Sequence, residues 1–291
     1  MLTARNIAVA VTIVLSACAL PSSAGIIWYT AETGGSSGWS HLYSIDTATS
    51  AIADRGLIHG QRYITDLAID VDGVLYAVGW ANGMANGSSK LYKITPGDAN
   101  TSAQWQIVTI KSNRMDRTVN GAVMQDGDLF VSASDGRFQK LSFDAGHDRW
   151  VVVKSINTGH ASAGDLAFSG DGSTLYVALQ GGSLGRVNFD SNSGNFGHVT
   201  VIGSSGYNDL YGLAWTDGKL YGTTNGHSGY DISYLVNLDT LTALASNPVA
   251  LCQGVWGAAA GLPMVPEPAT MGVLAVGATL LILLRRPVAK A

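Results

Sequence analysis

The stretch Asp165-Leu-Ala-Phe-Ser-Gly-Asp-Gly172-Ser-Thr-Leu-Tyr176 decides the fold class of this chain, because the same pattern occurs four times. In each copy a short apolar run leads into an Asp-Gly pair, and a second apolar run with an aromatic residue follows. The other copies are Asp66-Leu-Ala-Ile-Asp-Val-Asp-Gly73-Val-Leu-Tyr76, Asn120-Gly-Ala-Val-Met-Gln-Asp-Gly127-Asp-Leu-Phe130 and Gly212-Leu-Ala-Trp-Thr-Asp-Gly218-Lys-Leu-Tyr221. Asp-Gly between short apolar runs is the strongest local hairpin signal, because both turn positions require positive φ. The sequence therefore predicts four equivalent β-hairpins.

A second pair of strands is expected after each of these hairpins. In the third copy, for example, Leu184-Gly-Arg-Val-Asn-Phe189 alternates polar and apolar residues, a polar turn follows, and Val199 to Ile202 forms a further apolar run. Successive copies begin 54, 45 and 47 residues apart. Four strands in about 45–50 residues is the period of a β-propeller blade. The body of the chain is therefore expected to be an all-β propeller.

The two ends of the repeating region complete one further blade. The segment Ile26-Ile-Trp28-Tyr29, followed by His41-Leu-Tyr-Ser-Ile45, matches a unit without its first strand. The segment Gln253-Gly-Val-Trp256-Gly-Ala-Ala-Ala260 matches a first strand without its unit. Pairing of these two segments would close the ring and remove exposed strand edges. We therefore expect five four-stranded blades; six or more blades, with a divergent unit in the 54-residue interval, and a β-sandwich are the alternatives.

Composition agrees with short strands joined by tight turns. The chain has 291 residues, of which 46% are hydrophobic, only 13% are charged and 36 are glycines. Subtracting the four basic residues and the one acid of the terminal segments leaves 13 basic and 20 acidic side chains, a net charge of −7. A body this acidic argues against nucleic acid as a partner, because nucleic-acid binding depends on Lys and Arg at phosphates.

The N-terminus has the pattern of a secretory signal peptide. Arg5 precedes an apolar run from Ile7 to Leu20, and small residues lead to Ala24. We expect signal peptidase to remove residues 1–24, so that the mature chain begins at Gly25. An alternative is a lipoprotein signal, because Leu15-Ser16-Ala17-Cys18 resembles a lipobox in which Cys18 would be lipidated.

The C-terminus carries a short motif, an apolar segment and a basic pair. Pro266-Glu267-Pro268 precedes an apolar run from Met271 to Leu284, and Arg285-Arg286 follows. With Ala269 and Thr270 the run predicts a transmembrane helix over residues 269–284, and the arginines favour an outward-facing body because Lys and Arg stay cytoplasmic.

These three parts, in this order, resemble the PEP-CTERM sorting signal of Gram-negative bacteria that produce exopolysaccharide. The same segment is also known as the ice-binding protein C-terminal domain, which by itself says nothing of ice binding by the body. The resemblance covers residues 265–291 and implies recognition and cleavage by a membrane exosortase. The expected organisation is a signal peptide over 1–24, a propeller body over 25–264 and a sorting signal over 265–291. The protein would be exported to the cell envelope or extracellular matrix and held briefly in the inner membrane by its C-terminal helix.

Polar residues near the start of each first strand form the candidate ligand site. In a propeller the connections into these strands converge on one face around the central channel, and convergent polar groups at a shared mouth are the default binding-site hypothesis. The candidate residues are Arg62, Asp66, Arg117, Asn120, His160, Asp165 and Asp209. The alternative is that they are solvated loop residues or caps of strand ends.

Two tryptophans on Gly- and Asn-rich loops, Trp39 and Trp80, could stack on the sugars of a polysaccharide, or could instead fill the interfaces between blades. No metal or cofactor motif and no nucleophile elbow is found in the sequence. We therefore expect a non-enzymatic propeller that binds polysaccharide, such as exopolysaccharide, or protein. The alternative function is a propeller hydrolase or lactonase that acts at the channel mouth.

Overall fold

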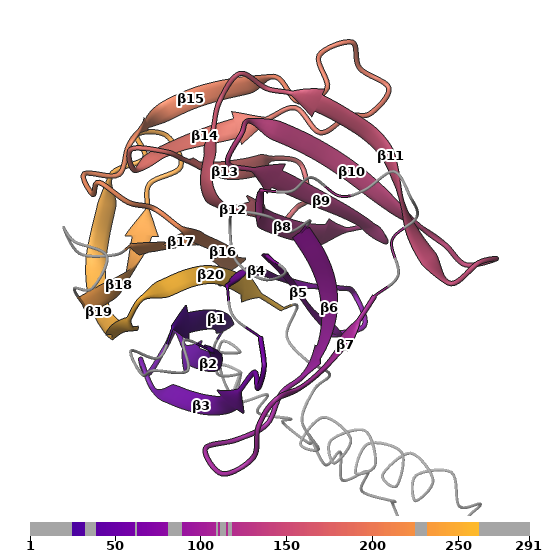
Figure 1. The fold of residues 1–291 in the computed structure, drawn as a ribbon. Coiled ribbons are helices and arrows are strands. Elements are labelled where there is room, and N and C mark those ends of the chain that lie inside the picture. Colours follow the sequence, from indigo (N-terminus) through magenta and orange to yellow (C-terminus); the bar gives the residue numbers. More distant parts are fainter. Residues whose placement is uncertain are drawn as a thin grey trace, which may run out of the picture.

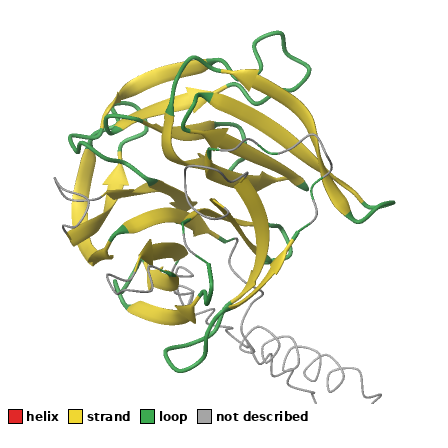
Figure 2. Ribbon diagram, in the orientation of Figure 1, coloured by secondary structure: helices red, strands yellow, loops and turns green. Residues whose placement is uncertain are grey.

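The protein is a five-bladed β-propeller. The structure, a computed structural model, describes residues 25–261 except 33–38, 62, 81–88, 109, 111–114, 116–117 and 225–231. Its strands form five four-stranded sheets arranged in a ring (Figure 1). Every regular element in these residues is a strand, as Figure 2 shows, and none of them belongs to a helix that could cross a membrane. The expected fold class and the count of five blades are confirmed.

Each blade begins with its innermost strand, next to the axis of the ring (Figure 1). Blade I contains β20 (Val255–Ala260), β1 (Ile26–Glu32), β2 (Ser40–Asp46) and β3 (Ile52–Leu57). Blade II contains β4 (Ile64–Ile69), β5 (Leu75–Trp80), β6 (Ser89–Thr95) and β7 (Gln104–Ile107). Blade III contains β8 (Val119–Gln125), β9 (Asp128–Ala133), β10 (Arg137–Asp144) and β11 (Arg149–Asn157). Blade IV contains β12 (Ser162–Phe168), β13 (Leu175–Leu179), β14 (Ser183–Val187) and β15 (Val199–Ser204). Blade V contains β16 (Gly212–Thr216), β17 (Lys219–Thr224), β18 (Ile232–Leu238) and β19 (Ala245–Gln253).

Blade I is built from both ends of the body and closes the ring. Strand β20 pairs antiparallel with β1, and Trp28 lies opposite Ala259 in this pair. Trp28 and Trp256 therefore belong to one sheet, as the sequence predicts. Because the last strand is held by the first hairpin, the ring cannot open without breaking a β-ladder.

The Asp-Gly turns adopt two geometries, so one detail of the expectation is wrong. Asp126 and Gly127 both have positive φ, and Asp217 with Gly218 forms the same two-residue turn. In the other two hairpins only the glycine, Gly73 or Gly172, has positive φ. Those turns are longer, and a side chain organises each of them: Asp70 Oδ1, for example, accepts hydrogen bonds from the main-chain nitrogens of both Asp72 and Val74. A carboxylate cap of this kind removes the need for a second left-handed residue.

The hydrophobic core is divided into five clusters, one between each pair of neighbouring blades. Between blades I and II, for example, Leu42 and Trp28 pack against Leu67 and Tyr92. Each inner strand lies between two neighbouring blades, so its side chains are almost all buried on both faces of the sheet.

The predicted terminal segments are outside the described residues. These are the signal peptide over 1–24 with Cys18, and the sorting signal over 265–291 with its expected helix over 269–284.

Candidate functional site

The seven residues of the predicted ligand site differ in their location and exposure in the fold. Asp66 and Asp165 lie on the inner strands β4 and β12 and are completely buried, and Asn120 on β8 is 8% exposed. His160 is exposed, and Asp209 is half-buried, each in a connection that leads into an inner strand. Arg62 and Arg117 are outside the described residues.

Asp66 and Asp165 meet at the axis of the propeller, which we call the hub. Aligned by their apolar residues, the five inner strands place Asp66, Gly121, Asp165, Gly212 and Gly257 at equivalent positions. Gly257 has no side chain and so leaves the space that Asp66 occupies. A Cβ atom on Gly257 would collide with Asp66, and one on Gly212 would lie 2.8 Å from the Cβ of Ala258.

The hub carboxyls are held by main-chain amides. The nitrogen of Ala122 donates a hydrogen bond to Asp66 Oδ2 at 2.6 Å. Asp165 Oδ2 accepts from the nitrogen of Leu213 at 2.7 Å and from that of Ala258 at 3.2 Å. Asp66 Oδ1 has no donor partner although it is buried.

Burial raises the pKa of both hub carboxyls well above the ordinary value. For Asp66 the charge and the hydrogen bond of the neighbouring Asp165 carboxyl raise the pKa further. For Asp165 the hydrogen bonds with Asp66 and with main-chain amides oppose the effect of burial, yet the pKa remains raised. The hub therefore holds an interacting pair of fully buried carboxyls.

The described hydrogen bonds of Asn120 and His160 lead away from this pair. The Nδ2 atom of Asn120 donates to the main-chain oxygen of Ser162 at 3.0 Å, which ties blade III to blade IV. His160 bonds only locally, through its main-chain groups, with Thr158. The structure thus brings Asp66 and Asp165 together, but inside the core rather than at an open mouth.

Trp80 lies at the interface between blades II and III. Its indole nitrogen donates to the main-chain oxygen of Val119 at 2.9 Å, and its ring centroid is 6.5 Å from that of Tyr63. A half-buried ring with its polar atom paired in this way has the features of an interface residue.

Trp39 contributes to an open groove between blades I and II. Its ring centroid is 4.0 Å from that of His59. The imidazole of His59 and the indole of Trp105 are part of the lining of a cavity of about 520 Å³, completed by Ser102, Ala103 and Gln104. We call this cavity, with Trp39 beside it, the aromatic groove.

The Trp105 side chain in the aromatic groove is held by a hydrogen bond and by a ring contact. The indole nitrogen of Trp105 donates to the main-chain oxygen of His59 at 2.9 Å, and the Trp105 ring packs edge-on against Tyr92 at 5.7 Å between centroids. The Trp105 ring is therefore held in place before any ligand arrives. Trp105 was not predicted as a site residue. Nothing in the sequence near residue 105 indicates that β7 of blade II contacts the residues that follow β3 of blade I.

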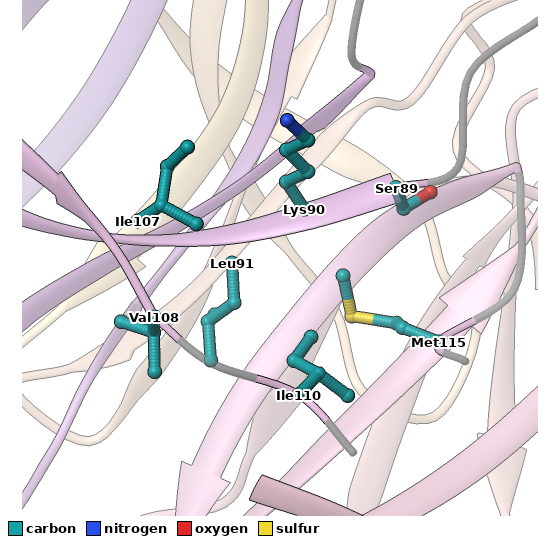
Figure 3. Close-up of a pocket in the computed structure, with 7 residues that line it drawn as sticks. All are labelled: Ser89, Lys90, Leu91, Ile107, Val108, Ile110 and Met115. Atoms are coloured by element: carbon teal, nitrogen blue, oxygen red, sulfur yellow. The ribbon is translucent and has the colours of Figure 1, made fainter. Parts of the chain in front are cut away.

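A second cavity of about 330 Å³ lies beside β6 and the connection into β8. Figure 3 shows Lys90 and Leu91 on opposite sides of β6, with Val108, Ile110 and Met115 on the side of Leu91. Five of the seven lining residues are apolar, and Lys90 is the cationic one.

The part of the chain that the structure describes contains no group of three or more His, Cys, Asp or Glu side chains arranged to hold a metal ion. The described surface offers aromatic rings beside polar groups in the aromatic groove, an arrangement suited to binding a ligand.

No family model matches this sequence, and no curated protein matches it. Solved structures that resemble it include a protein of unknown function from Bacteroides thetaiotaomicron, at 14% identity and a TM-score of 0.45 over 75% of this chain. The chain spans 57% of the length of that protein. A chain of a nidogen/laminin complex is 13% identical, with a TM-score of 0.49 over 83% of this chain and 100% of its own length. A candidate 6-phosphogluconolactonase from Bacteroides uniformis is 11% identical, with a TM-score of 0.44 over 77% of this chain and 81% of its own. These likenesses concern the fold alone.

Proposed function

We propose that this chain is an exported protein of the cell envelope or extracellular matrix whose propeller binds polysaccharide in the aromatic groove. Export rests on the N-terminal signal over 1–24, and sorting by an exosortase rests on Pro266-Glu267-Pro268 with Arg285 and Arg286. Signal peptidase and exosortase are then its processing partners, and the inner membrane holds it through residues 269–284 until it is released.

The aromatic groove is the observation that carries the binding function. Sugar rings present apolar faces and a rim of hydroxyl groups, so a binding site needs flat apolar side chains next to hydrogen-bonding groups. Trp39, His59 and Trp105 supply the rings, and Ser102 and Gln104 supply uncharged polar groups. Because Trp105 is already fixed by its hydrogen bond to His59, little conformational entropy is lost on binding.

The charge of the body favours a neutral polysaccharide. Among the described residues, the groove lining contains no carboxylate, lysine or arginine, and the body as a whole carries a net charge of −7. An acidic body repels an anionic polymer at a distance. We therefore propose neutral chains, in an exopolysaccharide matrix, as the ligand.

Hydrolysis is the weaker candidate on geometric grounds. A glycosidase needs two carboxyls that reach the scissile bond. Asp66 and Asp165 form a carboxyl pair in the described part of the fold, but both are completely buried and bonded to main-chain amides.

Binding is tested by electrophoresis of the full-length chain in gels that contain a neutral β-glucan, dextran or anionic alginate. The neutral polymers are expected to retard the wild type. Trp39→Ala and His59→Ala are expected to weaken retention about tenfold, which is the effect of removing one aromatic anchor. The matched control is Phe143→Ala, since Phe143 is an exposed aromatic residue on β10, 46% exposed and outside the groove. Equal retention of wild type and both groove variants would refute the proposed site.

Export is tested separately by mass spectrometry of the secreted protein. We expect a mature N-terminus at Gly25 and no peptide from the apolar part of the tail when the exosortase is present. A diacylated peptide that begins at Cys18 would establish the lipoprotein route instead, and an intact C-terminal tail in secreted material would contradict sorting.

A further inference from the structure

The hub must solve a hydrogen-bonding problem that the propeller fold itself creates. The innermost strand of each blade has only one hydrogen-bonded neighbour, so peptide groups on its other edge face the axis. The space there is closed, and buried amides without partners are costly. In this protein four of those amides bond to the two hub carboxyls, from Ala122, Leu166, Leu213 and Ala258.

The two carboxyls together reach all five blades. Asp66, on β4 of blade II, accepts from β8 of blade III. Asp165, on β12 of blade IV, accepts from β16 of blade V and from β20 of blade I. The contact between Asp66 and Asp165 joins blades II and III to blades IV, V and I at the axis, in addition to the contacts between neighbouring blades.

Two ionised carboxylates could not maintain that link. The strands β4, β8, β12, β16 and β20 carry no other titratable side chain, so none of them supplies a cation to offset two buried negative charges. Like charges in contact keep one carboxyl protonated. A protonated Asp66 can donate a hydrogen bond to Asp165, which gives the buried Oδ1 atom of Asp66 a partner. Asp165 is the carboxyl that stays ionised, because several main-chain amides donate to it and stabilise its negative charge.

We propose that Asp66 and Asp165 form a one-proton clasp that holds the two sets of blades together, so that the closed ring loses stability as the pH rises. The folded pair retains one proton that the unfolded chain releases above about pH 4, where free aspartate titrates. Because the folded state then binds more protons than the unfolded state, raising the pH favours unfolding. The folding equilibrium constant should fall about tenfold per pH unit until the clasp itself loses its proton.

Surface carboxylates change the stability with pH in the opposite direction, and they do so at lower pH. Main-chain and side-chain hydrogen bonds lower the pKa of Asp171 to about 2, and hydrogen bonds also lower the pKa of Asp46 and Asp239. Their contribution is present above the unfolded pKa and is lost as the pH falls below it. Measurements between pH 5 and 9 therefore separate the clasp from these groups.

The test is urea unfolding of the full-length chain between pH 5 and 9, for wild type and Asp66→Asn. The asparagine amide donates permanently where the shared proton did, and its oxygen still accepts from Ala122. The wild-type stability should fall with pH, and that of Asp66→Asn should not. The matched control is Asp72→Asn, which removes one carboxylate from an exposed turn and should keep the wild-type slope.

A wild-type profile without slope, or an Asp66→Asn profile with the full slope, would overturn the proposal. Stabilisation of the wild type by added calcium, absent in Asp66→Asn, would also overturn it, because a cation would then replace the proton. If Asp66→Asn does not fold, infrared spectra of the wild type decide: a protonated-carboxyl band at pH 7 that shifts with isotope-labelled aspartate supports the clasp, and its absence refutes it.

Discussion

The main-chain nitrogen of Gly25 donates a hydrogen bond to Asp217 Oδ2 at 2.9 Å. The same oxygen accepts from Thr47 Oγ1 at 2.6 Å, and the Gly25 carbonyl oxygen accepts from the Thr47 nitrogen at 3.0 Å. Gly25 is buried at this junction between blade I and the Asp-Gly turn of blade V. The first residue of the predicted mature chain is thus docked on the last complete blade.

Processing should strengthen this contact. Cleavage after Ala24 converts the Gly25 amide into a charged ammonium that faces the Asp217 carboxylate. In a chain that begins at Gly25, Asp217→Asn should lower stability by about 0.5–1 kcal/mol, since Asp217 is exposed and its ion pair is screened. In a chain that retains residues up to Ala24 the loss should be smaller. Thermal unfolding at low and high salt measures both, and equal losses in the two chains would contradict an ion pair formed by cleavage.

Replacement of a hub glycine should destabilise the ring. A Cβ atom at Gly257 would collide with Asp66 and lie 2.8 Å from the main-chain oxygen of Thr65. Gly257→Ala should therefore cost roughly 2–3 kcal/mol through overpacking. The control is Gly194→Ala, because that position has open space around it and no positive φ. Urea unfolding measures both variants, and a loss at Gly257 no larger than that at Gly194 would refute the close packing of the hub.

Trp39 and Trp80, which the sequence predicts to have the same role, should differ in the effects of their substitution. Trp80→Phe removes the hydrogen bond to Val119 at the interface of blades II and III and should cost about 1 kcal/mol of stability. It should leave retention on neutral polysaccharide unchanged, whereas Trp39→Ala should reduce retention. Loss of retention in Trp80→Phe, with unchanged stability, would instead place the sugar at Trp80.

Cys252 should react slowly with thiol reagents in the folded protein. Burial raises the pKa of its thiol, and the thiolate is the reactive form. At neutral pH the thiolate fraction is therefore lower than that of a free cysteine, and the rate should increase only in alkaline solution. The rate of modification in buffer, compared with that in urea, tests this, and equal rates would contradict the burial of the thiol.

Much of the fold follows from local sequence. The Asp-Gly pairs at Gly127 and Gly218 specify tight turns, and the alternation around them specifies strands, because turn geometry and side-chain direction depend on few residues. The closure by Trp28 and Ala259 could be inferred because each end of the body carries only part of a unit. The longer turns at Asp70 and Asp171 were not foreseen, since they depend on side-chain caps rather than on the Asp-Gly pair.

The sequence by itself determined the repeat and favoured five blades with a ring closed by both ends of the body, because these depend on periodicity and on pairing rules that act along the chain. The tertiary structure decided that the count is five and not six. The sequence also identified Asp66 and Asp165 as candidate residues, but only the tertiary structure decided that they face each other in the core, where Gly257 of blade I leaves room for Asp66. The aromatic groove also depends on tertiary structure. Trp39, His59 and Trp105 come from two blades, and their proximity depends on how blade II packs against blade I. Packing between blades is a property of whole surfaces, so no single repeat encodes it.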